Sequence, residues 1–197
     1  MSSLTRVSRI YPKNVLLLLC DMQEKFRPTI SYFPQVIANT KKLMEVASIL
    51  KIPMVATEQY PKGLGPTVEE LDLHKFEIKP QEKTQFSMLT QDIVKSVEKK
   101  ESLILCGIEA HACILHTVFD LVEMQKEVFI PVDCVSSRSL VERKWAFKRL
   151  ESFPNVHLTT VETLVLEFLK SSAHPDFKAC QRFISLPSED SDIINIL

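Results

Sequence analysis

Short, nearly continuous apolar runs alternate with amphipathic segments along this chain. Residues 14–20 (NVLLLLC) form such a run, which is typical of a buried parallel strand. Residues 34–50 instead repeat their apolar positions with the spacing of a helix. The pattern predicts strands over residues 14–20, 52–57, 76–79, 103–106, 128–132 and 156–158. It predicts helices over residues 34–50, 89–100, 113–125, 140–151, 162–170 and 175–184.

This alternation predicts an α/β fold in which a mainly parallel sheet of about six strands has helices on both faces. The folded domain is expected over residues 13–184, between an N-terminal segment 1–12 and an acidic, frayed tail 185–197. Residues 58–75 contain two of the three glycines, so we expect a functional loop there.

The composition fits one globular domain and argues against two classes of partner. Of the 197 residues, 45% are hydrophobic, which is enough for a substantial core. The 24 basic and 25 acidic residues give a formal net charge of −1, so we do not expect the basic surface of a nucleic-acid-binding protein. No apolar run approaches the roughly 20 residues of a membrane-spanning helix, so no membrane partner is expected.

The cysteines and the first residues bear on the compartment. The five cysteines form no CxxC pair, which fits a reducing, intracellular environment. Cys20 and Cys106 end apolar runs and are predicted to be buried thiols that act as small hydrophobic residues. Residues 1–14 lack the apolar stretch of a secretory signal, but they hold two arginines, one lysine and no acid. We therefore expect a cytoplasmic protein, with a mitochondrial location as the alternative.

Residues 102–121 carry the strongest chemical signal in the chain. An apolar run stops at Gly107, and Cys113 follows where a helical pattern begins. The partial positive charge and free N–H groups of a helix N-terminus favour a thiolate and can bind an oxyanion. This arrangement predicts that Cys113 is a nucleophile.

Polar residues also follow the other predicted strands, whose carboxyl ends share one edge of a parallel sheet. Asp21 follows the first strand and can accept the proton of a thiol. Lys83 follows the third, and its positive charge can stabilise a nearby thiolate. The remaining polar residues at strand ends are Glu58, Gln59, Glu109, His111, Asp133, Ser136, Ser137 and Arg138.

Three motifs occur in the chain in a recognisable order: LLLLCDMQEKF, EKTQFS and GIEAHACILHT. Together they resemble the isochorismatase-like cysteine hydrolases over roughly residues 13 to 170. The phrases TEQYPKGLGPTV and CGIEAHACIL are most similar to the eukaryotic isochorismatase domain-containing proteins. Some members of that subgroup carry a mitochondria-associated ribonuclease label.

The resemblance implies a three-layer α/β/α, Rossmann-like fold and a catalytic triad of Asp21, Lys83 and Cys113. It also implies a cis peptide at residues 108–109 and an oxyanion hole made by the backbone N–H groups of Glu109 and Cys113. The candidate residues for the substrate pocket are Phe26, Gln59, Tyr60, Phe86, Glu109 and Arg138.

Two departures from the family narrow the chemistry. The metal-dependent nicotinamidases carry an Asp-x-His motif near the second strand, but this chain reads TEQYPKGLGPT there and offers only His74 nearby. We therefore expect no metal and no other cofactor. Isochorismatases proper need no thiol, so Cys113 favours an amide, an ester or a related small carbonyl substrate.

Each candidate residue also has a structural interpretation. Cys113 could be a packed thiol, Asp21 a cap of the next turn and Lys83 a solvated loop charge. Arg138 could hold a substrate carboxylate or form a structural ion pair. The remaining open cases are His111 and His116, which could be catalytic or lie at a surface, and Trp145, which could belong to the core or to an oligomer contact.

At the level of the whole protein, a metal-independent cysteine hydrolase that forms a thioacyl intermediate is the first hypothesis. A catalytically silent binding or scaffold protein on the same fold is the alternative, and a ribonuclease is favoured least. We expect a small-molecule substrate, whose identity the sequence does not give, and a homo-oligomer.

Overall fold

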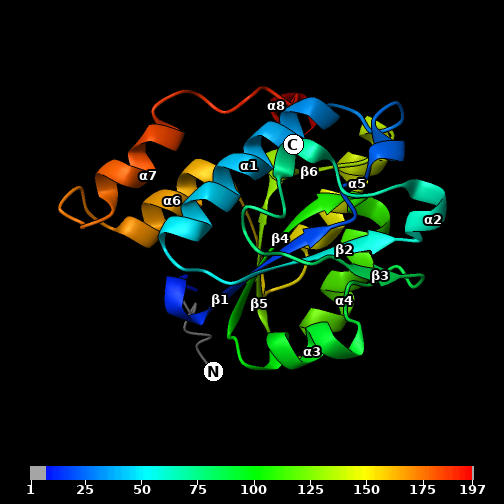
Figure 1. Cartoon of the computed structure of the whole chain (residues 1–197), viewed down its shortest axis with the longest axis horizontal. Helices are drawn as coiled ribbons and strands as arrows, with labels where there is room; N and C mark the ends of the chain where they lie inside the picture. The colour runs from blue at the N-terminus through cyan, green and yellow to red at the C-terminus, as the bar shows by residue number, and fades with distance from the viewer. Residues whose placement is uncertain (1–7, 197) are drawn as a thin grey trace.

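Seven strands, all parallel, form one sheet at the centre of the molecule (Figure 1). The computed structural model describes residues 8–196. Residues 1–7 of the expected N-terminal segment 1–12, which are half of the stretch considered for mitochondrial targeting, lie outside the described residues. The strand order is β3-β2-β1-β4-β5-β7, and β6 pairs with β4 beside this path. The strands are β1 (Val15–Cys20), β2 (Met54–Gln59), β3 (Gln81–Lys83), β4 (Ser102–Ile108), β5 (Glu127–Pro131), β6 (Val135–Ser136) and β7 (Val156–Thr159).

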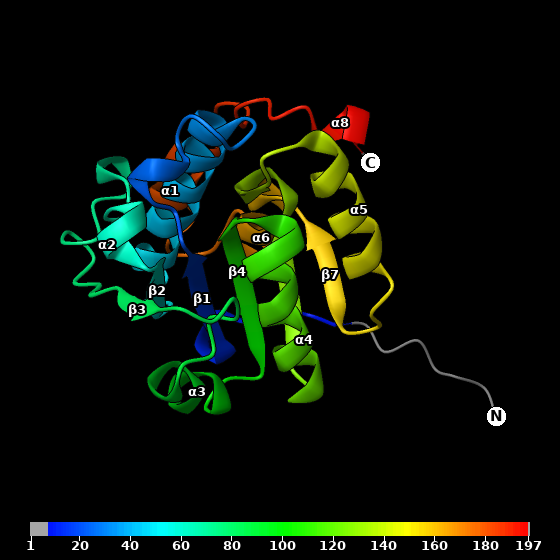
Figure 2. The same cartoon turned by 90° about the vertical axis from the view of Figure 1, so that its right-hand side faces the viewer.

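Helices cover both faces of this sheet, as the three-layer prediction requires. Helices α1, α6 and α7 pack on one another on one side, and Figure 1 shows α3 and α4 on the other. Figure 2 shows α4 running alongside β4, with α5 next to it. The helices are α1 (Phe33–Ile49), α2 (Pro61–Leu64), α3 (Gln91–Glu98), α4 (Leu115–Glu123), α5 (Leu140–Glu151), α6 (Val161–Leu169), α7 (Phe177–Ile184) and α8 (Ile193–Ile196). Within residues 8–196, no helix combines the length and the apolar character that crossing a bilayer requires.

The two central strands are buried along their whole length. Every residue of β1 and every residue of β4 is shielded from solvent, which explains their nearly continuous apolar sequences. Each fully buried leucine or isoleucine contributes about 1.5–3 kcal/mol of hydrophobic stabilisation. The centre of the sheet is therefore a rigid support for whatever follows its carboxyl edge.

The prediction of a third strand over residues 76–79 was wrong. Residues 76–79 do not form a strand, because hydrogen-bonded turns join Asp72 to Lys75 and His74 to Glu77, and Glu77 has a positive φ of 56°. The apolar side chains in this stretch pack against the core from a turn. The strand follows a few residues later as β3, whose polar sequence gives no sign of it. Strand β6 was not predicted, and the loop 58–75 contains α2 and a short 3-10 helix (Glu69–Leu71).

The prediction of a frayed tail was also wrong for its described part. The Arg143 guanidinium is fully buried and donates to the backbone oxygen of Ser191 at 2.6 Å and to that of Val132 at 3.0 Å. Asn39 exchanges two hydrogen bonds with the backbone of Glu189, both at 3.2 Å. A buried guanidinium needs such acceptors, because an unpaired buried charge is costly. The tail is thereby held against α1 and α5.

Gly107 allows β4 to approach β1 closely at the carboxyl edge. Its φ is +117°, and a Cβ atom there would lie 2.1 Å from the backbone oxygen of Cys20. We expect Gly107→Ala to lower the free energy of unfolding by about 3 kcal/mol or more, because it adds backbone strain to a clash with an immobile strand. Chemical denaturation measures this change.

Gly63→Ala is the matched control for this prediction. A Cβ atom at Gly63 would meet only the ring of Tyr60, which is 56% exposed and free to turn away. We expect its cost to stay within about 1 kcal/mol. Equal effects of the two substitutions would contradict the close approach of β1 and β4.

Candidate active site

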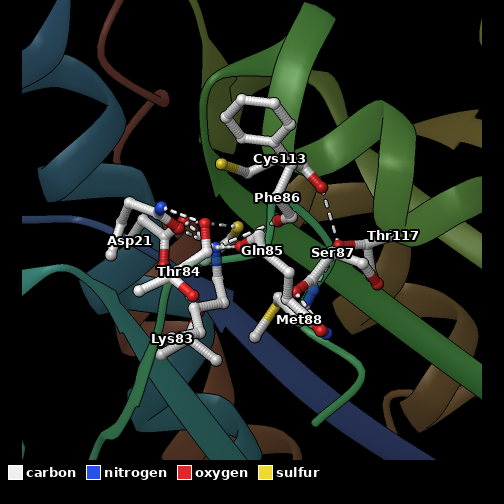
Figure 3. Close-up of polar contacts among 12 residues, drawn as sticks. Asp21, Lys83, Thr84, Gln85, Phe86, Ser87, Met88, Cys113 and Thr117 are labelled. Atoms are coloured by element: carbon white, nitrogen blue, oxygen red, sulfur yellow. Dashed lines mark hydrogen bonds and ion pairs between the residues drawn. The ribbon is translucent and has the colours of Figure 1, made fainter.

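The side chains of Asp21, Lys83 and Cys113 meet at the carboxyl edge of the sheet (Figure 3). Asp21 directly follows β1, Lys83 is the last residue of β3, and Cys113 lies just beyond β4. The chain builds β2 and β3 on one side of β1 and then continues with β4 on its other side. Ligand sites of parallel α/β sheets form at such a reversal of strand order.

Asp21 and Lys83 form a buried ion pair. The Lys83 Nζ atom lies 2.6 Å from Asp21 Oδ2, and each side chain is only 1% exposed. Nζ also donates to the side-chain oxygen of Gln59 at 2.7 Å and to the backbone oxygens of Gln85 and Phe86 at 3.1 and 3.0 Å. The alternative of a solvated loop charge is therefore wrong for Lys83, because its ammonium is enclosed by acceptors.

Asp21 is held from a second direction. Its Oδ1 atom accepts a hydrogen bond from the Thr57 hydroxyl at 2.7 Å, and the thiol of Cys20 donates to Oδ2 at 3.6 Å. Asp21 has a positive φ of 50°, which ends the regular alternation of side chains along β1. The carboxylate and the Cys20 thiol consequently reach the same side.

The surroundings keep Lys83 protonated. Burial lowers the pKa of Lys83, but the neighbouring Cys20, Asp21 and Cys113 raise it by more, and the net pKa lies above its ordinary value. The ammonium is therefore a fixed positive charge beside the carboxylate and the two thiols.

Cys113 lies in a wide helical turn that precedes α4. Residues Ala110–Ile114 form a π-helix, so the predicted single helix over 113–125 begins earlier and with a different winding. π-helical turns are rare and occur mainly at functional sites. Cys113 is 8% exposed, and the Ile108–Glu109 peptide in front of this turn is cis, as the resemblance implied.

Hydrogen bonds through Thr117 join the Cys113 turn to the loop that follows Lys83. The hydroxyl of Thr117 donates to the backbone oxygen of Cys113 at 2.6 Å and accepts from the backbone N–H of Met88 at 2.9 Å (Figure 3). Thr117 is fully buried. Sequence reasoning gave it no role, although the spacing Cys-x-x-x-Thr was the available signal.

Arg138 forms the ion pair that was one of its two predicted alternatives. Its NH2 and Nε atoms donate to the carboxylate of Glu109 at 2.6 and 3.0 Å, and its backbone N–H donates to the same group at 3.1 Å. His111 Nδ1 lies 3.0 Å from the Ser137 hydroxyl. These contacts fasten the residues around the cis peptide to the segment 136–138.

The other predicted pocket residues take different positions. Gln59 contacts Lys83, whereas Tyr60 and Phe86 are 56% and 54% exposed. The His116 ring packs between those of Phe86 and Phe119. Phe26 is partly buried against the core. A cavity of about 450 Å³ adjoins this region and is lined by Tyr60, Pro61, Lys62, Glu82, Lys83, Thr84, Gln85, Thr90 and Gln91.

Two residues lie apart from the site. Trp145 is 62% exposed, so of its two predicted alternatives the core position is wrong, and the oligomer contact stays a prediction. The carboxylate of Asp133 accepts hydrogen bonds from the backbone N–H of Val161, at the start of α6, and therefore serves the packing of that helix.

One group of side chains within the described part of the chain has donor atoms close enough for a metal ion. The sulfur atoms of Cys20 and Cys113 and a carboxylate oxygen of Asp21 all lie within 4.8 Å of one another. The ammonium of Lys83 already neutralises that carboxylate and would repel a cation. The group therefore suits thiol chemistry better than metal binding.

Comparison with known proteins identifies the family. The model of the isochorismatase domain matches residues 15–163, and the chain belongs to this family, whose members are generally hydrolases. Isochorismatase domain-containing protein 2 of Danio rerio is 46% identical over 191 residues, which cover 95% of each chain.

Solved structures agree with this assignment. A Caenorhabditis elegans protein described as MAR1 ribonuclease is 42% identical, with a TM-score of 0.90 over 94% of this chain and 97% of its own. The Escherichia coli YcaC gene product, described as an octameric hydrolase of unknown specificity, has a TM-score of 0.78 over 91% of this chain and 98% of its own. At 19% identity it shows the fold alone.

The pair of Glu109 and Arg138 predicts a pH-dependent contribution to stability. Burial raises the pKa of Glu109, but the hydrogen bonds and charge of Arg138 outweigh this effect, and the net pKa is lowered. The stabilisation is therefore present above the ordinary glutamate pKa of about 4.3 and is lost as the pH falls through the lower folded-state pKa. We expect Arg138→Ala to reduce the free energy of unfolding by about 1–2 kcal/mol at pH 7.

The difference between wild type and Arg138→Ala should shrink as acid protonates Glu109, which denaturation at a series of pH values measures. Lys95→Ala is the control, because the pair of Lys95 and Asp92 is 70% and 72% exposed and contributes little. A difference that stays constant from pH 7 into the acid range would show that Arg138 acts through packing alone.

Proposed function

We propose that this protein is a metal-independent cysteine hydrolase that acts on a small amide, ester or related carbonyl compound. The observation that carries the proposal is the buried Asp21–Lys83 ion pair, whose carboxylate lies within 4.8 Å of the Cys113 sulfur. A nucleophile, a proton acceptor and a fixed positive charge are thereby present together.

In the proposed first step, Asp21 takes the proton of the Cys113 thiol and the sulfur attacks the substrate carbonyl carbon. The carbonyl electron pair moves to oxygen, and the backbone N–H groups of Glu109 and Cys113 are the proposed donors to this oxyanion. Collapse of the intermediate breaks the bond to the leaving group, which receives the proton from Asp21. The product of this step is a thioester on Cys113.

In the second step, Asp21 removes a proton from water, and the hydroxide attacks the thioester. The carbon–sulfur bond breaks, the acid is released, and the departing sulfur takes the proton back from Asp21, which restores the Cys113 thiol and the Asp21 carboxylate. Lys83 supplies a positive charge that favours the thiolate. It does not transfer a proton in this scheme, because its raised pKa keeps it charged.

The proposed substrate is small. The cavity beside Lys83 has a volume of about 450 Å³, in the size range of sites for small molecules. Asp21 and Cys113 are not among its lining residues, so a substrate held there must extend toward Cys113 to react. Gln59, Tyr60, Phe86 and Phe26 are the proposed wall residues. Arg138 is proposed as a residue at the edge of the pocket, because its side chain is 63% exposed while it is paired with Glu109.

Alkylation tests the activated thiolate without knowledge of the substrate. We expect iodoacetamide to modify Cys113 at pH 7 about tenfold faster than it modifies an unactivated cysteine, and Lys83→Ala to remove about tenfold of that rate. Peptide mapping by mass spectrometry locates the modification. Lys95→Ala, which removes an exposed lysine far from this chemistry, should leave the rate unchanged.

Lys83→Ala leaves the buried carboxylate of Asp21 unpaired and risks loss of the fold. The double variant Asp21→Asn with Lys83→Met removes both charges, leaves no uncompensated charge in the interior, and is expected to fold, so it is the second variant for the same measurement. An alkylation rate that is ordinary in wild type and unchanged by either variant would overturn the proposed thiolate.

Turnover tests the hydrolase itself. We expect a panel of p-nitrophenyl esters and aryl amides to include a substrate whose hydrolysis is abolished by Cys113→Ala, while circular dichroism and the denaturation midpoint stay at wild-type values. Cys106→Ala is the control, because Cys106 is a fully buried cysteine whose thiol donates a hydrogen bond to the backbone oxygen of Leu18. Full activity in Cys113→Ala would contradict the mechanism, and an unreactive Cys113 would favour a binding or scaffold protein.

Ribonuclease is the second candidate, and one observation favours it: the name of the C. elegans structure that is 42% identical. A purified sample that cleaves single-stranded RNA, and that loses this activity in Cys113→Ala, would support it. Cleavage that persists in Cys113→Ala would instead indicate a contaminant.

A homo-oligomer is proposed on two grounds. The E. coli neighbour is described as octameric, and helix α5 of this chain exposes Val141 and Trp145 by 64% and 62%, one helical turn apart. Light scattering on the purified protein determines its state. The cytoplasmic location and the mitochondrial alternative stay predictions.

A further inference from the structure

The proposed hydrolysis leaves one reactive group of the site unused, the thiol of Cys20. Cys20 is the last residue of β1 and is fully buried. Its sulfur lies within 4.8 Å of both the Cys113 sulfur and the Asp21 carboxylate, and its thiol donates to Asp21 Oδ2 at 3.6 Å. The site therefore contains two thiols and one shared carboxylate.

The two thiols differ in their access to solvent. Cys113 is 8% exposed and can meet a small oxidant, whereas Cys20 has no exposed surface. Burial and the hydrogen bond with Cys113 hold the pKa of Cys20 well above its ordinary value. Cys20 thus rests as a protonated thiol and does not compete with Cys113 for substrate or oxidant.

We propose that Cys20 is the resolving cysteine for Cys113, so that a hydroperoxide converts the pair into a reversible disulfide that switches the site off. This inference rests on the reactive thiolate proposed for Cys113. It adds a modification site and a class of oxidant to the function proposed above.

The chemistry balances in two steps. Asp21 takes the proton of the Cys113 thiol, and the thiolate attacks one oxygen of hydrogen peroxide. The oxygen–oxygen bond breaks, Cys113 becomes a sulfenic acid, and the departing hydroxide takes the proton from Asp21 to form water. The Cys20 sulfur then attacks the Cys113 sulfur and passes its proton to Asp21. The sulfur–oxygen bond breaks, and the departing hydroxide takes that proton to form a second water.

The geometry permits this closure with a limited movement. A disulfide requires a sulfur–sulfur distance of about 2.05 Å, so the two atoms must approach by at most about 2.7 Å. Cys20 is fixed between its register partners Thr57 and Gly107 in the centre of the sheet. The movement must therefore come from Cys113 and its π-helical turn.

Peroxide treatment followed by mapping of the unreduced peptides tests the proposal. In wild type we expect a peptide pair that joins Cys20 to Cys113, with a mass lower by two hydrogens. Iodoacetamide should no longer reach Cys113, and dithiothreitol should restore its full alkylation. Cys106→Ala should behave as wild type, because the sulfur of Cys106, on the neighbouring strand β4, takes no part in the proposed disulfide.

In Cys20→Ala, the sulfenic acid has no partner and continues to the sulfinic acid, which carries two added oxygens. Dithiothreitol should then fail to restore alkylation of Cys113. If Cys20→Ala does not fold, Cys20→Ser is the second variant. The serine hydroxyl fills the same space and preserves a hydrogen-bond donor to Asp21.

The outcomes separate this proposal from the hydrolase. Fast alkylation of untreated Cys113 with sulfinic acid as the main product in wild type overturns the disulfide and leaves the hydrolase intact. Equal recovery of wild type and both Cys20 variants also overturns it. Slow alkylation of untreated Cys113 overturns the hydrolase proposal instead. It also overturns the disulfide proposal, because an unreactive Cys113 thiol is not oxidised by peroxide.

Discussion

The buried ion pair between Asp21 and Lys83 is the constraint on which the rest of the site depends. Removing two charges from water costs several kcal/mol for each ion, so such a pair persists only where every remaining donor and acceptor is satisfied. Thr57 occupies the second oxygen of Asp21, and Gln59 with two backbone carbonyls of the 84–88 loop surrounds the Lys83 ammonium. The pair therefore fixes the ends of β1 and β3, and the loop that follows β3, relative to one another. A partner removed from this set leaves a charge uncompensated in the interior.

The sheet brings the third member to the pair. Since β1 lies between β2 and β4, the residues that follow β1 and β4 emerge side by side, although about ninety positions separate them in the sequence. Thr117 then closes the arrangement, because it binds both the Cys113 turn and Met88 of the loop that begins after Lys83. Cys113 and the ion pair are consequently coupled by packing and by hydrogen bonds.

Features of the fold and of the site that neighbouring residues encode could be predicted from the sequence, whereas features that depend on contacts between distant segments could not. The apolar run of β1 and the acid directly after it are local signals, and they located Asp21 at the correct edge of the sheet. Strand β3 carries no such signal, since its sequence Gln-Glu-Lys is polar and only its pairing with β2 makes it a strand. The burial of Arg143 could not be predicted either, because its backbone acceptors lie 11 positions earlier, at Val132, and 48 positions later, at Ser191. Cys20 was correctly predicted to be buried, yet its place beside Cys113 depends on the pairing of β1 with β4 and on the π-helical turn after β4, which an apolar pattern does not encode.

Cys20 and Cys113 have different environments although their sulfur atoms lie within 4.8 Å of each other, and the backbone around each cysteine accounts for the difference. Cys20 ends a strand whose neighbours on both sides supply hydrogen bonds, so its sulfur is confined and its proton is retained. Cys113 belongs to a π-helical turn and retains 8% exposure, whereas Cys20 has none. Asp21 lies between them and accepts from Cys20 while it is paired with Lys83. A carboxylate in this position can receive a proton from either sulfur, so the proton acceptor proposed for hydrolysis is also the acceptor that a disulfide-forming step would require. The proposed hydrolysis and the proposed oxidation thus draw on one electrostatic arrangement, and the thiol that reacts first is set by access.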